Sequence, residues 1–94
     1  MNNLAWFLAT CNDPAIRDGA SAINLAEKAV AATNRKEPNY LDTLAAAWAE
    51  AGQFAKAVTI QKEAMAVLRD GESREDYASR LKLYESNKPY RVSE

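Results

Sequence analysis

Histidine is absent from this 94-residue chain, and cysteine occurs only once, as Cys11. Because histidine is the commonest general base and metal ligand, its absence argues against acid–base catalysis and against a histidine-ligated metal. No nucleophile–base pair, metal-ligand cluster or phosphate-binding loop is present, so we expect no enzymatic activity, no cofactor and no metal. Cys11 has no base to activate it and is expected to be a small packing or loop residue. A single cysteine forms no internal disulfide, which fits a reducing compartment.

An excess of charge of one sign and long apolar runs are also missing. The chain has 12 Lys and Arg against 13 Asp and Glu, for a net charge of −1. A nucleic-acid surface needs a basic face to neutralise phosphates. No apolar run approaches the roughly 18 residues of a membrane span, and the first residues lack the basic segment of a secretion signal. We therefore expect a cytoplasmic protein that binds neither nucleic acid nor membrane.

Glycine and proline are scarce, with three of each, whereas alanine accounts for much of the 48 % hydrophobic content. Alanine has the highest helix propensity, and its small side chain lets helix axes come close together. This composition predicts an all-α fold. A chain of this length is expected to form one small domain, residues 1–94, of modest stability.

Apolar side chains recur at helical spacing in five segments of the chain. The segment after Gly52, for example, opens with Phe54 and continues with Ala57 and Val58 on one face. Such stripes are typical of helices that bury one side. The predicted helices cover about residues 2–10, 19–33, 40–51, 54–69 and 74–86, and residues 87–94 are predicted to be non-helical.

Helix ends are marked by capping residues and breakers. Asp18 is expected to cap the second helix and Asn39 the third, because their short side chains can accept hydrogen bonds from the first turn. Gly52 is expected to end the third helix in the left-handed conformation. Ser73 opens a capping-box pattern before the fifth helix. Asn12-Asp13-Pro14 breaks the first helix and can open a short turn.

Two alanine pairs repeat along the chain. Ala22 and Ala29 recur 35 residues later as Ala57 and Ala64, and the residues around them are also similar. Self-similarity at a period of roughly 20–50 residues is typical of solenoid arrays, in which each unit buries its apolar face on a neighbour. We therefore expect all four alanines to point at neighbouring helices.

The chain resembles the tetratricopeptide repeat (TPR) family. The resemblance is strongest in residues 38–71, where the family's large, small, turn and aromatic positions are matched by Leu41, Leu44, Ala45, Trp48, Gly52, Phe54, Ala57 and Ala64. Residues 1–35 match less well, with a turn between the two helices about five residues too long. Residues 73–86 resemble the capping helix of such arrays. The amino-acid sequence is similar to the C-terminal repeats of longer bacterial members, so the chain is either a fragment or a short stand-alone protein.

The resemblance implies a right-handed superhelical array of two antiparallel helix–turn–helix repeats with a C-terminal capping helix. In this family the first helices line a concave groove that binds peptides or proteins. The matching positions here are Asn2, Asn3, Trp6, Ala9, Thr10, Asp42, Thr43, Ala46, Ala49 and Glu50. Members that clamp a C-terminal carboxylate use basic residues and Asn there. Because the second repeat offers Asp42 and Glu50 instead, we expect no such clamp and a preference for a basic or neutral segment.

Several of these residues also have an ordinary structural interpretation. Trp48 is expected to lie in the core, whereas Trp6 either faces the groove or packs against other residues. Asp42 and Glu50 share a helix face that is either part of the groove or simply solvated. Tyr77 and Tyr84 are expected to dock on the fourth helix as a lid. The tail at residues 88–91 either folds back on the last helix or serves as a binding segment.

The sequence therefore predicts a non-catalytic module that binds a protein or peptide in a preformed helical groove. The main alternative is a self-association or end-capping element of a larger repeat protein, which forms a homodimer through the first helix with Trp6 and Phe7. Arrays usually need about three repeats for independent stability, and this chain has two and a cap. RNA binding by a related repeat of the same period is a third possibility, disfavoured by the charge balance and the turn from Gly52 to Phe54.

Overall fold

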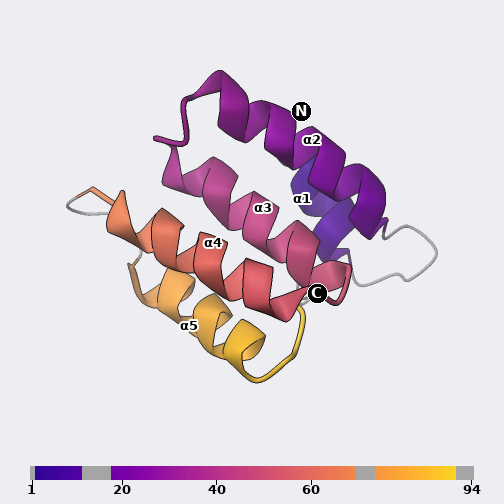
Figure 1. Ribbon diagram of the computed structural model, residues 1–94, viewed down its shortest axis with the longest axis vertical. Coiled ribbons are helices and arrows are strands. Elements are labelled where there is room, and N and C mark those ends of the chain that lie inside the picture. Colours follow the sequence, from indigo (N-terminus) through magenta and orange to yellow (C-terminus); the bar gives the residue numbers. More distant parts are fainter. Residues whose placement is uncertain (1, 12–17, 70–73, 91–94) are drawn as a thin grey trace.

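The computed structural model describes residues 2–11, 18–69 and 74–90, without the side chains of residues 2 and 3. Within these described residues the chain forms five helices, arranged as in Figure 1, which confirms the predicted all-α class. They are α1 (Asn2–Thr10), α2 (Gly19–Ala32), α3 (Pro38–Glu50), α4 (Phe54–Ala66) and α5 (Arg74–Glu85). The predicted turn at residues 12–14 and the predicted cap at Ser73 lie outside the described residues. None of the described helices is long and apolar enough to cross a membrane.

Helix α3 begins two residues earlier than predicted. Pro38 occupies its first turn, the N-cap is Glu37, and no side chain caps the helix. The expected cap at Asn39 is therefore wrong. The reason is that proline has no N–H to satisfy and already holds a helical φ, so it starts a helix readily. Helix α4 ends at Ala66, about three residues before the predicted end.

Two other helix ends follow the predictions. The Asp18 carboxylate accepts a hydrogen bond from the backbone N–H of Ser21 at 3.1 Å, and this bond holds the pKa of Asp18 below its usual value. Gly52 has a φ of 82°, the left-handed conformation that glycine adopts without steric cost after a helix. Both features are local in the sequence, which is why short-range reasoning found them.

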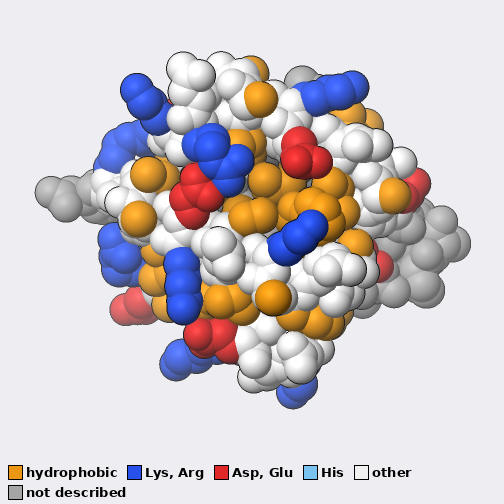
Figure 2. Space-filling view, viewed as in Figure 1, with side chains coloured by type: hydrophobic (Ala, Val, Ile, Leu, Met, Phe, Trp, Pro, Cys, Tyr) orange, Lys and Arg blue, Asp and Glu red, His pale blue; other side chains and the backbone are white. Residues whose placement is uncertain are grey.

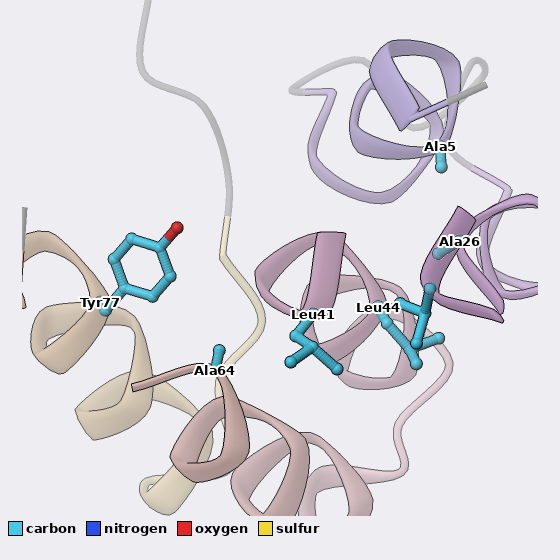
Figure 3. Packing of buried hydrophobic residues seen from close by; sticks show 7 residues of the cluster. Ala5, Ala26, Leu41, Leu44, Ala64 and Tyr77 are labelled. Atoms are coloured by element: carbon cyan, nitrogen blue, oxygen red, sulfur yellow. The ribbon is translucent and has the colours of Figure 1, made fainter. Parts of the chain in front are cut away.

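Helix α3 is the centre of the molecule and packs against α1, α2 and α4, while α5 packs against α4 (Figure 1). Figure 3 shows Leu41 and Leu44 of α3 within the core, with Ala26 of α2 on one side and Ala64 of α4 on the other. Of the thirteen residues of α3, only four retain more than a trace of exposure: Asn39, Tyr40, Trp48 and Glu50. A helix buried on nearly all sides leaves little room for a solvated face.

The repeated alanines are buried as predicted. Ala22, Ala57 and Ala64 are fully buried, and Ala29 is 5 % exposed. Ala22 packs beside Ala46 of α3, and Ala57 packs beside Tyr84 of α5. Small side chains at these points let the helices approach closely, so each alanine acts as a spacer between neighbours.

Candidate functional site

Three aromatic rings surround the guanidinium group of Arg80 on α5. Its central carbon lies 5.0 Å from the ring centre of Tyr77, 5.4 Å from that of Tyr90 and 5.6 Å from that of Trp6. At these distances each ring attracts the cation through its negatively charged face. We call this group the Arg80 cluster, and its members are Trp6, Asp42, Tyr77, Arg80 and Tyr90.

Asp42 of α3 neutralises the charge of Arg80. The Nε of Arg80 donates to Oδ1 of Asp42 at 2.8 Å, and the two side chains are only 13 % and 7 % exposed. The same carboxylate oxygen accepts a bond from Gln61 of α4 at 3.0 Å, and Gln61 also donates to the backbone carbonyl of Tyr77. Burial raises the pKa of the Asp42 carboxyl, and Arg80 and Gln61 oppose that rise. The network fixes Arg80 in place and joins α3, α4 and α5.

The C-terminal tail completes the cluster. After α5, Asn87 adopts a φ of 60°, and the backbone N–H of Lys88 donates to the carbonyl of Leu83 at 2.8 Å. This turn reverses the chain, and Figure 3 shows the described segment after the turn passing between Tyr77 of α5 and helix α3. The ring of Tyr90 then lies 5.6 Å from that of Trp6, tilted by 41°. Of the two alternatives left open for the tail, the described residues 88–90 show the fold-back, and Tyr90 reaches beyond α5 to Trp6 of α1.

A surface hollow of about 270 Å³ lies beside the cluster. Its lining residues are Asp76, Ser79, Arg80, Leu83 and Tyr90. Asp42 already neutralises Arg80, so among the described residues the carboxylate of Asp76 is the remaining formal charge of the lining. The hollow is thus slightly acidic and borders the ring of Tyr90.

Most of the groove positions expected from the sequence are buried. Asp42 is 5 % exposed, the other buried positions are at most 1 % exposed, and these are Ala9, Thr10, Thr43, Ala46 and Ala49. Trp6 and Glu50 are half-buried, and the side chains of Asn2 and Asn3 are not described. The buried positions form the contact between helices, so of the predicted set only Trp6 and Glu50 present described side-chain surface.

The hydroxyl and carboxyl groups among these positions are used within the protein. Thr10 donates to the backbone carbonyl of Trp6 at 2.7 Å, and Thr43 donates to that of Asn39 at 3.1 Å. Asp42 turns toward Arg80 rather than sharing a solvated face with Glu50. From the sequence, Asp42 was expected to lend the groove an acidic surface. Its carboxylate instead forms an internal ion pair with Arg80.

Arg80 was not among the site residues predicted from the sequence, although a signal for it is present there. Tyr77, Leu81 and Tyr84 form the predicted apolar stripe of α5, and Arg80 lies three residues after the first tyrosine and four before the second. Residues at these spacings share a helix face. A lone arginine inside an apolar stripe indicates a buried partner of opposite charge, which here is Asp42 on α3.

The two tyrosines of α5 dock on the neighbouring helix, as predicted. Tyr77 is 8 % exposed and lies in the same hydrophobic core cluster as Ala64 of α4. Tyr84 is fully buried beside Ala57 of α4. The hydroxyl group of Tyr84 is buried and has no hydrogen-bond partner among the described residues. Burial raises the pKa of this phenol.

A different face of the molecule carries a second aromatic–cation contact. Trp48, which was expected in the core, is partly buried and packs against two core clusters, and the ammonium of Lys56 lies 4.2 Å from the centre of its ring. Figure 2 shows hydrophobic side chains over α3 and α4 with charged side chains of both signs around them. The shallow hollow on α4 is lined by Ala55, Lys56, Thr59 and Ile60, with few groups that could orient a ligand.

Helix α1 carries the large hydrophobic side chains that are most exposed in the described part of the chain. Leu4 is 52 % exposed and Phe7 is 48 % exposed. They are three residues apart and therefore share one side of α1. In the same described part, no group of three His, Cys, Asp or Glu residues is placed to hold a metal ion.

No protein family model, no curated protein and no solved structure matches the chain. The functional interpretation therefore depends on the geometry of the Arg80 cluster and of the helices that carry it.

Proposed function

We propose that the chain is a non-catalytic protein-interaction module that binds an extended segment of another protein. The proposed site is the face between α1 and α5, with α3 beneath it. One observation carries the proposal: the chain's own non-helical tail lies on this face, with Tyr90 against Trp6 and Arg80. A surface that holds a non-helical segment of its own chain has the shape and chemistry to hold a similar segment of a partner.

The repeat pattern supports the same proposal. In this interpretation α1–α2 and α3–α4 are two TPR-like hairpins in a superhelical array, and α5 is the capping helix. The equivalent alanines of α2 and α4 are all buried, as such stacking requires. The first helices of the two hairpins and the cap would then bound one groove, where Trp6 of α1 and Arg80 of α5 meet. Because these helices are already ordered by packing, binding costs little conformational entropy.

Selection from a random peptide library tests this function. Dodecapeptides are selected on the immobilised 94-residue Tyr90→Ala variant, whose face is uncovered. The selected peptides, once labelled, should bind this variant with micromolar affinity in fluorescence anisotropy. We expect Trp6→Ala to weaken this binding about ten-fold, because stacking on an aromatic ring contributes about 1–1.5 kcal/mol. Phe7→Ala, on the exposed side of the same helix, is the matched control and should leave it unchanged. Failure to select any peptide, or equal binding by the Trp6→Ala variant, would contradict the proposal.

A homodimer through α1 is the second candidate, favoured by the exposed pair Leu4 and Phe7. In a symmetric dimer these side chains would pack against their counterparts in the partner chain and would no longer be exposed to solvent. Sedimentation velocity at increasing protein concentration should then show a dimer that Phe7→Lys disrupts. A wild-type chain that stays monomeric at high concentration rejects this candidate and leaves the peptide-binding proposal untouched.

A further inference from the structure

We propose that Tyr90 occupies the subsite for a partner's aromatic residue, and that the partner is a protein segment with an aromatic side chain between basic residues. This inference rests on the proposed function and adds the chemistry of the partner. The tail would act as an internal competitor that the partner displaces.

The subsite suits a flat aromatic ring. Asp42 holds the guanidinium of Arg80 in place, and a fixed guanidinium offers a planar cationic face on which aromatic rings stack. Trp6 supplies a second aromatic surface, and Tyr90 touches both. Aliphatic or acidic side chains at this position would gain neither contact.

The aromatic side chain of the tail is less deeply buried than the two tyrosines of α5. Tyr90 is half-buried, whereas Tyr84, six residues earlier, is fully buried. The turn at residues 87–88 is anchored by backbone hydrogen bonds, but Pro89 has no N–H and cannot extend that pattern. Displacing Tyr90 therefore requires only the residues after this turn to move, and the helices stay as they are.

The charges around the subsite favour basic flanks. Arg80 is neutralised by Asp42, which leaves Asp76 to set the sign of the neighbouring hollow. The tail itself places Lys88 before Tyr90 and Arg91 after it in the sequence. A partner segment with the same order, basic–aromatic–basic, would meet an aromatic subsite beside a carboxylate, and this charge complementarity selects against acidic segments.

Three labelled octapeptides and the 94-residue chain test this inference. The first peptide has the sequence of residues 87–94, the second has alanine in place of its tyrosine, and the third has serine in place of its lysine and arginine. We expect the first to bind the Tyr90→Ala chain about ten-fold more tightly than the wild-type chain, because the internal competitor is gone. The second peptide should bind Tyr90→Ala about ten-fold more weakly than the first, and the third several-fold more weakly.

A Tyr90→Phe chain is the matched control, since it keeps the ring and should bind all three peptides as weakly as the wild-type chain does. Circular dichroism establishes that both variants are folded. Equal binding of the tyrosine and alanine peptides to Tyr90→Ala would overturn the inference. If library peptides bind at Trp6 but the tyrosine peptide does not, the inference fails and the proposed function stands. If neither kind of peptide binds, both fail.

Discussion

Replacing Arg80 with methionine should lower the free energy of unfolding by about 3 kcal/mol at pH 7. Methionine keeps much of the apolar stem but removes the guanidinium, and Gln61 is then the one donor to the buried carboxylate of Asp42 among the described residues. Breaking a buried ion pair is costly because the remaining charge has lost its partner and cannot reach water. Urea-induced unfolding followed by circular dichroism measures this loss.

The loss should also depend on pH. In the folded wild type, burial already raises the pKa of Asp42 above its ordinary value of 3.8, and Arg80 limits the rise. Without Arg80 the folded-state pKa rises further. Between the unfolded and folded pKa values the folded state binds more protons, so stability falls as the pH increases through this window. The destabilisation by Arg80→Met should therefore be larger at pH 7 than at pH 4.

Arg69→Met is the control for this prediction. Arg69 also forms an ion pair, with Glu37 at 3.0 Å, but the two side chains are 59 % and 42 % exposed. Exposed pairs contribute little, so we expect a change within about 0.5 kcal/mol at either pH. Equal effects of the two substitutions, or a loss for Arg80→Met that shrinks as the pH rises, would show that the Asp42–Arg80 pair does not hold α3 and α5 together.

Replacing Ala57 with leucine should lower the free energy of unfolding by about 2 kcal/mol. Ala57 is fully buried on α4 and packs beside Ala45 of α3 and Tyr84 of α5, so a larger side chain has no space to enter. Either the helices separate or Tyr84 leaves its position, and both lose packing contacts. The same urea experiment measures the change.

Ala55→Leu is the matched substitution on the same helix, two residues earlier and exposed. Its effect should be within about 0.5 kcal/mol, because the added side chain extends into solvent. If Ala57→Leu were as stable as Ala55→Leu, the alanines repeated along the chain would not be spacers between helices. The structural basis proposed for the repeat would then be wrong.

Much of the fold could be predicted because it depends on local chemistry. The Asp18 cap and the left-handed Gly52 depend on neighbours within a few residues. The buried alanines follow from helical periodicity, which the sequence displays directly. The error at the start of α3 arose because Pro38 and Asn39 are both good helix starters, and the preference of proline for the first turn prevailed.

The candidate site was less predictable because it joins residues that are far apart in the sequence. Asp42 and Arg80 are 38 residues apart, and Trp6 is still farther from Tyr90. Sequence reasoning placed Trp6 and Asp42 on one groove and left the role of the tail open. It could not show that α5 brings an arginine to Asp42 or that the tail reverses after Asn87. Both outcomes depend on how whole helices pack, which no short pattern encodes.

The contact between the tail and α1 is the observation on which the proposed function depends. A two-dimensional nuclear Overhauser spectrum of the 94-residue chain measures it directly, because ring centres 5.6 Å apart bring some protons of Trp6 and Tyr90 close enough to exchange magnetisation. We predict cross-peaks between the two rings in the wild type, and their loss when a basic–aromatic–basic peptide is added in excess. A folded chain that lacks these cross-peaks from the outset would contradict the account.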